Sequence, residues 1–170
     1  MGKVAEKIKI GRGVKVKAIC VFGHGDQLLV IEQVERDTGQ TAWKMPGGNV
    51  ELGETTYECA VREVREELGA EIRDVDRLGV IENIFQANGQ QRHQIVFVYR
   101  ATFTDPSFYG ADSLRVVEGK REYIASWKPM SELYEARAVL RPQGLLDLLG
   151  DKLEPEAGPQ QNTFWRHTRR

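Results

Sequence analysis

A short segment, residues 46–70, restricts what this chain can fold into more than any other part of the sequence. It opens with Pro-Gly-Gly, a chain break with unusual backbone freedom. Thr55 and Glu58 then form a T-x-x-E capping box, and Gly69 supplies a stop signal. We therefore predict a helix from Thr55 to Leu68, bounded on both sides by glycine-containing turns.

Apolar residues recur along this helix at positions i, i+4, i+7 and i+11, which predicts one apolar stripe made of Tyr57, Val61, Val64 and Leu68. The rest of the chain alternates in the manner of strands. We predict strands at 14–22 and 27–34, joined as a hairpin, then at 77–85 and 92–103 around a turn at Ala87-Asn88-Gly89, and at 122–128, with short helices starting near Ser131 and Pro142. Strands before and after a capped helix predict an α/β fold, with a mixed β-sheet packed between helices.

The length of 170 residues is typical of one domain. We assign residues 1–150 to that domain. Residues 151–170 are rich in Pro, Gly and Gln and form a C-terminal appendage, either disordered or docked.

Composition excludes several classes of function. The net charge of -1, from 24 basic and 25 acidic residues, gives no surplus of positive charge for nonspecific nucleic-acid binding, and we expect no specific nucleic-acid partner.

Cys20 and Cys59 lie among apolar residues and are expected to be reduced core thiols. No apolar run is long enough to cross a bilayer, and the N-terminus lacks the apolar core of a signal peptide. We expect a soluble, cytoplasmic protein without a membrane partner.

Three glutamates share one face of the predicted helix: Glu63, Glu66 and Glu67 stand at i, i+3 and i+4. A solvated acidic face is the ordinary explanation of such a cluster. However, like charges at i and i+4 cost about 0.2–0.5 kcal/mol, and a divalent cation would relieve that repulsion. Oxygen ligands with no nearby His or Cys favour Mg²⁺ or Mn²⁺ over Zn²⁺.

Two further features belong with these acids. Gly47-Gly48 lets the backbone approach a phosphate or turn a carbonyl toward a metal, although a plain turn would look the same. Arg62 has Glu58 at i−4 and Glu66 at i+4, so it can hold a ligand in place or form a simple surface ion pair.

Residues 48–70 read GNVELGETTYECAVREVREELGA, which resembles the Nudix box G-x5-E-x7-R-E-U-x-E-E-x-G-U, where U is a bulky aliphatic residue. The fixed positions are filled by Gly48, Glu54, Arg62, Glu63, Val64, Glu66, Glu67 and Gly69. Only the last U departs, because Ala70 stands there, and this is a packing position. Eight matches within one short segment are far more specific than a lone glycine motif.

The resemblance implies a fold, an activity and roles for individual residues. The fold is the α/β/α sandwich of the Nudix hydrolases, and the activity is pyrophosphohydrolysis with Mg²⁺ or Mn²⁺. Glu63, Glu66 and Glu67 would bind metal, together with a backbone carbonyl of Gly47 or Gly48. Glu63 or a downstream acid would take the proton of the attacking water. Arg62 would orient the ligand carboxylates, and Glu54 would buttress the site or contact a metal.

The downstream acid has two candidates, Glu118 and Glu122, and of these we place Glu122 among the catalytic residues. Glu118 lies near the end of a predicted polar loop, residues 104–119, and Glu122 follows that loop. The loop is long enough to be either functional or a plain surface excursion. We expect it to cover the substrate, with Phe108 or Tyr109 near the base.

Substrate choice lies outside the box. Residues after Ala70 lack the Pro of ADP-ribose hydrolases and the Tyr of dinucleoside polyphosphate hydrolases at the expected distances. We assign Phe85, His93 and Trp43 to substrate binding, although a buried Trp43 is the commoner case.

The expected substrate is a small nucleotide, a nucleoside diphosphate linked to a further moiety, and we favour a nucleoside triphosphate. The alternatives are a dinucleoside polyphosphate, a nucleotide sugar, or a Nudix domain that senses a ligand without catalysis. Because sensors usually lose a catalytic Glu and this chain keeps all of them, we favour the enzyme. The sequence leaves a homodimer open.

Overall fold

The computed structural model describes residues 9–10, 13–135 and 139–150. The predicted appendage at 151–170 lies outside the described residues. In chain order the elements are β1 (Lys9–Ile10), β2 (Lys15–Val21), β3 (Gly23–His24), β4 (Gln27–Val34), β5 (Thr41–Lys44), β6 (Gly47–Asn49), α1 (Thr56–Leu68), β7 (Ile72–Ala87), β8 (Gln90–Phe103), α2 (Ser107–Gly110), β9 (Ser113–Glu118), β10 (Arg121–Pro129), α3 (Met130–Tyr134), β11 (Val139–Arg141) and α4 (Leu145–Gly150).

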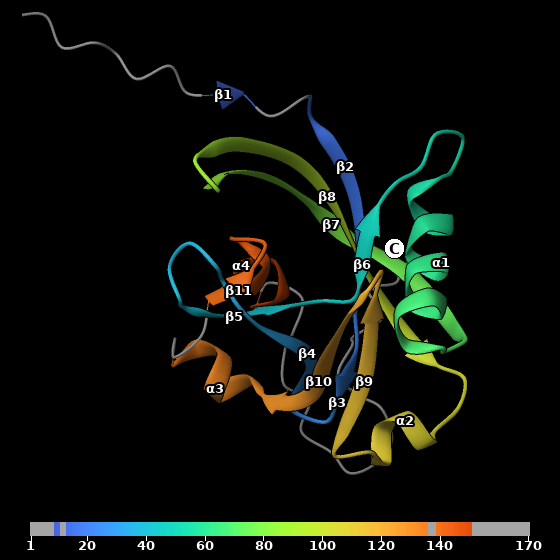
Figure 1. Ribbon diagram of the computed structural model, residues 1–170. Helices are drawn as coiled ribbons and strands as arrows, with labels where there is room; N and C mark the ends of the chain where they lie inside the picture. Colours follow the sequence, from blue (N-terminus) through green and yellow to red (C-terminus); the bar gives the residue numbers. More distant parts are fainter. Residues whose placement is uncertain (1–8, 11–12, 136–138, 151–170) are drawn as a thin grey trace, which may run out of the picture.

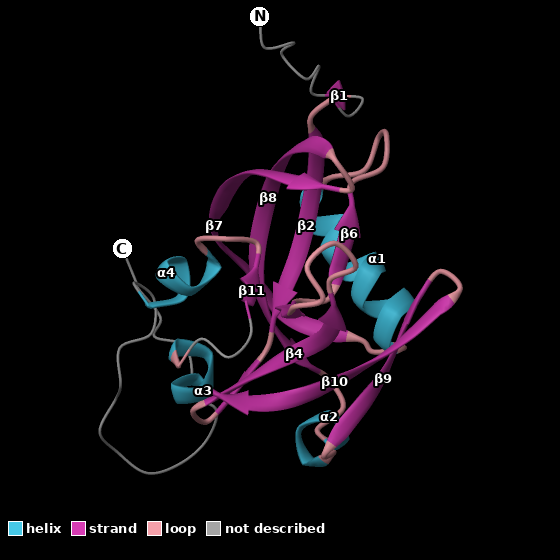
Figure 2. Ribbon diagram, turned by 60° about the vertical axis from the view of Figure 1, so that its left-hand side comes forward, coloured by secondary structure: helices cyan, strands magenta, loops and turns pink. Residues whose placement is uncertain are grey.

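The strands form two mixed sheets (Figures 1 and 2). In the first sheet, β2 runs parallel to β8 and antiparallel to β6, while β7 and β8 form a long antiparallel hairpin. In the second sheet the order is β11-β5-β4-β10-β9, with β3 beside β4. These mixed sheets with their few helices confirm the predicted α/β class.

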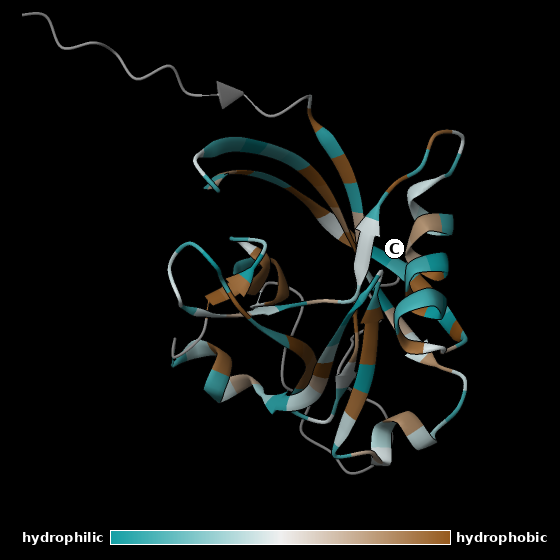
Figure 3. Ribbon diagram, viewed as in Figure 1, coloured by the Kyte–Doolittle hydropathy of each residue, from teal (hydrophilic) through white to brown (hydrophobic). Residues whose placement is uncertain are grey.

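Helix α1 packs on one side of the sheets, and α3 and α4 pack on the other (Figure 1). The core under α1 includes Ala18 and Cys20 of β2 together with residues of β4, β9 and β10, so both sheets contribute to it. The core on the opposite side includes Ile19 and Val21 of β2 together with residues of β4, α3 and α4. Strand β2 is central because both of its faces are buried. Hydrophilic and hydrophobic residues alternate around α1 and along β9, as expected for elements with one buried face (Figure 3).

The predicted hairpin between the first two long strands is wrong. β2 pairs with β8 and β6, whereas β4 pairs with β3, β5 and β10. The chain leaves one sheet at Phe22 and enters the other. Because β8 and β6 occupy the two edges of β2, no edge of β2 is left to pair with β4. The turn predicted at Asn88-Gly89 is confirmed, and both residues have positive φ, as a two-residue hairpin turn requires.

The predicted loop at 104–119 is also wrong, because this segment contains α2 and β9. Strand β9 pairs with β10 along its whole length, with Val116 fully buried. Phe108 stacks on Phe103 at 4.7 Å and Tyr109 on Trp127 at 5.5 Å. These aromatic rings are therefore packed beside the core and do not cover the box.

In the described part of the chain, no helix is long and apolar enough to cross a membrane.

Candidate active site

The ends of α1 form as the sequence predicted. The Thr55 hydroxyl accepts a hydrogen bond from the Glu58 backbone N–H at 3.1 Å, and the Glu58 carboxylate accepts one from the Thr55 N–H at 2.8 Å. Gly69 adopts the left-handed conformation, with φ of 65°, and its N–H bonds to the Arg65 carbonyl. The helix is thus held at both ends, which fixes the orientation of the glutamates between them.

The buried face of α1 differs from the predicted stripe. It consists of Cys59, Ala60, Val64 and Glu67, whereas Tyr57 is exposed. The helix packs against β2, β6 and β9, and this contact brings Glu67 inward rather than leaving it on a solvated face. The acidic cluster is therefore divided, with Glu66 exposed and Glu67 buried.

Arg62 is the centre of a network of carboxylates. Its Nε and Nη2 donate to the two oxygens of Glu54 at 2.6 and 3.0 Å, a forked contact. Its Nη1 donates to Glu63 at 3.0 Å and to Glu66 at 3.3 Å, and Nη2 also reaches the Asn49 carbonyl. This contact lowers the pKa of Glu54 to about 2, chiefly through the hydrogen bonds from Arg62. Arg62 thus holds three box carboxylates.

Glu67 is only 4% exposed, and the Gly47 backbone N–H donates to its Oε2 at 2.8 Å. Burial raises the pKa of Glu67 to about 7, and the negative charges of Glu118 and Glu63 act in the same direction. Burial also raises the pKa of Glu63. Carboxyl groups that lie close together and have shifted pKa values are typical of functional sites.

The two glycines of β6 leave space that side chains would fill. A Cβ built on Gly48 would lie 2.0 Å from Oε1 of Glu63, and one built on Gly47 would lie 2.2 Å from the carbonyl oxygen of Ala18. Gly47 also has φ of 144°, which strains any other residue. The carboxylate of Glu63 therefore lies directly against the backbone of Gly48.

Glu118, at the end of β9, completes this acidic group. Its carboxylate pairs with Lys44, and its charge acts on both Glu67 and Lys17. Glu122 lies elsewhere. It shares the opposite face of the β9–β10 hairpin with Arg115, and these two exposed side chains form an ion pair. The structure therefore brings Glu118, and not Glu122, to the box glutamates.

The three residues assigned to substrate binding have different surroundings. Trp43 is 3% exposed in the core that α3 and α4 cover, with its Nε1 donating to Glu32 at 3.2 Å. It therefore has the buried position expected as the commoner case, and its role in substrate binding stays a prediction. Phe85 and His93 line a cavity of about 260 Å³ near the tip of the β7–β8 hairpin. Their side chains point to opposite faces of that hairpin, and His93 contacts Glu82 at 2.8 Å.

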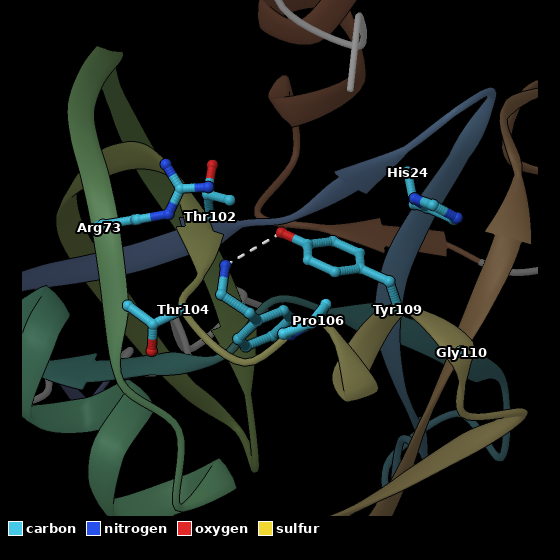
Figure 4. A pocket seen from close by; sticks show the side chains of 8 residues that line it. His24, Arg73, Thr102, Thr104, Pro106, Tyr109 and Gly110 are labelled. Atoms are coloured by element: carbon cyan, nitrogen blue, oxygen red, sulfur yellow. Dashed lines mark hydrogen bonds between the residues drawn. The ribbon is translucent and has the colours of Figure 1, made fainter. Parts of the chain in front are cut away.

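A larger cavity, of about 530 Å³, contains no residue of the box. His24, Arg73, Thr104 and Tyr109 are among the residues that line it (Figure 4). The Tyr109 hydroxyl accepts a hydrogen bond from the Phe103 N–H inside this cavity.

Two basic residues of the site were not singled out from the sequence. Lys17 stands on β2 and Lys44 ends β5, and both exert charge on the acidic cluster. Only the pairing of β2 with β6 shows that Lys17 lies beside the box.

As the side chains stand, no three His, Cys, Asp or Glu residues within the described ranges are grouped closely enough to enclose a metal ion. The reason is visible in the contacts, since Arg62 holds Glu54, Glu63 and Glu66 while Glu67 turns to Gly47. The donors are nevertheless of one chemical kind, because all are carboxylate or carbonyl oxygens, the ligands of hard divalent cations.

The chain is similar to known proteins. A family model described as the NUDIX domain matches residues 11–149. The protein designated MutT4 in Mycobacterium tuberculosis is 33% identical over 133 residues, which cover 76% of this chain and 50% of that protein. The protein named 8-oxo-dGDP phosphatase NUDT18 in Mus musculus is 32% identical over 102 residues, covering 59% of this chain and 30% of that protein.

This chain therefore spans half or less of the length of these two relatives. Among solved structures, the MutT NUDIX hydrolase from Burkholderia pseudomallei aligns with a TM-score of 0.56 and 27% identity, covering 71% of this chain and 86% of that one. Because this family model covers most of the chain, the chain belongs to the NUDIX domain family.

Proposed function

We propose that the chain hydrolyses a diphosphate linkage in a nucleoside diphosphate joined to a further moiety, with Mg²⁺ or Mn²⁺ held at the box glutamates. The observation that carries this proposal is the placement of Glu67. A carboxylate that is buried, faces two other acids and accepts only one backbone hydrogen bond is costly without a cation. A fold selected for stability alone would place an apolar residue there.

The residues that would hold the cation are Glu63, Glu66 and Glu67, together with a carbonyl of Gly47 or Gly48. These residues suit a hard divalent cation because all of their ligand atoms are oxygens. In addition, the pKa values of Glu63 and Glu67 are raised, and a divalent charge nearby would lower them. When bound, the cation neutralises the phosphate oxygens and lowers the pKa of the attacking water.

The protein's own groups have distinct parts in this reaction. Glu63 lies against Gly48 and is restrained by Arg62, so it is well placed to accept the proton of the water. Glu118 replaces Glu122 as the preferred downstream acid because it lies on the same side as Glu67. Glu54 and Arg62 orient the ligands through their forked contact.

The favoured substrate is a nucleoside triphosphate. The name of the mouse relative, an 8-oxo-dGDP phosphatase, supports a nucleotide that carries a diphosphate. A dinucleoside polyphosphate and a nucleotide sugar are the runners-up. A ligand-sensing role without catalysis is disfavoured because Glu63, Glu66 and Glu67 are all present and Gly48 leaves room for Glu63.

The test is a panel of nucleoside triphosphates, dinucleoside polyphosphates and nucleotide sugars, incubated with Mg²⁺ and assayed for released phosphate and pyrophosphate. Turnover of one class well above the others supports the proposal and names the substrate. Tight binding of a panel member without any turnover would favour the sensor instead.

A further inference from the structure

Lys17 stands on β2, beside the box. Along β2, Ile19 and Val21 belong to the core that α3 and α4 cover, and Lys17 shares their face because side chains alternate. It therefore lies on the side of β2 that faces away from the core under α1. Its register partner is Asn49 on β6, one residue beyond the glycines that contact Glu63 and Glu67.

The ammonium group of Lys17 faces acids without pairing with any of them. Burial and the charge of Lys44 lower its pKa, whereas Glu118, Glu67 and Glu63 raise it. Yet within the described residues no carboxylate comes within salt-bridge distance of Lys17. Lys44 differs, because it forms an ion pair with Glu118 and lies 4.7 Å from the ring centre of Tyr123.

This contrast separates two roles for a lysine. A lysine that only balances nearby acids gains most by direct contact, as Lys44 does. A partly buried ammonium that remains unpaired has lost hydration without gaining a hydrogen-bonded partner, which is unfavourable until an anion arrives. Lys17 thus has the properties of a ligand-binding cation.

We propose that Lys17 binds the phosphate group of the substrate next to the one held at the glutamates, and so makes the site selective for chains of two or more phosphates. This inference rests on the proposed function for the nature of the substrate. An ammonium is a compact point charge with three rotatable donors, which suits the spread oxygens of a polyphosphate. The acids and their cation would hold one phosphate, and Lys17 would hold its neighbour.

The test compares Lys17→Met and Lys17→Arg with Lys128→Met, a matched control in which another partly buried lysine is lost from the second sheet, where it pairs with Glu132. KM and kcat are measured on the best substrate of the panel, with pyrophosphate and orthophosphate as competing ligands. Lys17→Met should raise KM and the inhibition constant of pyrophosphate by roughly 10-fold or more, as expected for a lost charge-assisted hydrogen bond.

The inhibition constant of orthophosphate should change by less than about threefold, and Lys17→Arg should restore part of the affinity, because it keeps the charge. Lys128→Met should leave all of these values near wild type. Thermal unfolding of each variant shows whether it is folded. If Lys17→Met folds and both KM and the pyrophosphate constant stay within twofold of wild type, the inference is wrong.

Calorimetric titration with a methylene-bridged nucleoside triphosphate and Mg²⁺ separates this inference from the proposed function, because it needs no turnover. If the wild type binds this analogue but hydrolyses no panel member, and Lys17→Met loses binding, only the proposed hydrolysis fails. If the wild type neither binds nor hydrolyses any compound, both fail.

Discussion

The buried carboxylate of Glu67 accepts a hydrogen bond from the backbone N–H of Gly47 at 2.8 Å, which ties α1 to strand β6. This contact joins a glutamate near the end of the box to the residue that precedes the box, 20 positions earlier in the sequence. It also keeps Glu67 pointing at β6, where Glu63 approaches Gly48. The hydrogen bond therefore restrains the position of α1 relative to β6.

A first prediction concerns the stability of the metal-free protein. The pKa of Glu67 is raised from 4.5 to about 7, so the folded state holds this proton more tightly than the unfolded state. The stabilisation by the protonated form is complete below pH 4.5 and is lost as pH rises through about 7, a change of about 3 kcal/mol.

Urea unfolding in EDTA at pH 5 and pH 8 measures this loss. Glu67→Gln should remove it, so that the variant gains stability relative to wild type at pH 8 but not at pH 5. An equal difference between the two proteins at both pH values would show that Glu67 titrates normally.

A second prediction concerns Gly48. An added methyl group would lie 2.0 Å from Oε1 of Glu63, and because that atom ends a flexible side chain, the carboxylate should move and the fold should survive. Gly48→Ala should therefore lower kcat by on the order of 100-fold or more while changing the melting temperature little. Gly110→Ala is the control, because a methyl there meets no atom within 4 Å. Wild-type kcat in Gly48→Ala would mean that the position of Glu63 is unimportant.

A third prediction uses two arginines with the same contact geometry. Arg62 binds Glu54 through a forked contact, and Arg65 binds Glu71 through another, at 2.7 and 2.8 Å. Lysine cannot reproduce either fork. Arg62→Lys should lower kcat/KM by roughly 10- to 100-fold, as expected for a residue that orients ligands. Arg65→Lys, outside the site, should stay within twofold, and similar losses in both variants would point to a general effect on α1.

The sequence predicted the parts of this molecule whose signals are local. The capping box at Thr55, the stop at Gly69 and the turn at Asn88-Gly89 each depend on residues within a few positions of one another, and all three are confirmed. Hydrophobic periodicity identified the long strands for the same reason. Charge spacing likewise predicted that the box glutamates lie on one helix, but it did not show that Glu67 is buried while Glu66 is exposed.

Features that depend on distant contacts were missed. The partners of β2 are β6 and β8, and no local pattern distinguishes them from β4. The local pattern predicts a loop at β9 because its polar residues and the prolines and glycines around it conceal a strand that forms only against β10. The choice between Glu118 and Glu122 depended on that same hairpin, since it decides which face each side chain occupies. Trp43 was likewise ambiguous until packing showed it buried.

The most direct test of the account is the hydrolysis rate of the best panel substrate with Mg²⁺, with excess EDTA, and with Mg²⁺ added back, for wild type and Glu67→Gln. We predict that wild-type turnover disappears in EDTA and returns with Mg²⁺. Glu67→Gln should remain folded and lose on the order of 10³-fold in kcat even at saturating Mg²⁺. Glu71→Gln, an exposed glutamate just beyond the helix, should retain wild-type turnover. Full activity in EDTA, or near-normal turnover by folded Glu67→Gln, would contradict the claim that this helix binds the catalytic metal.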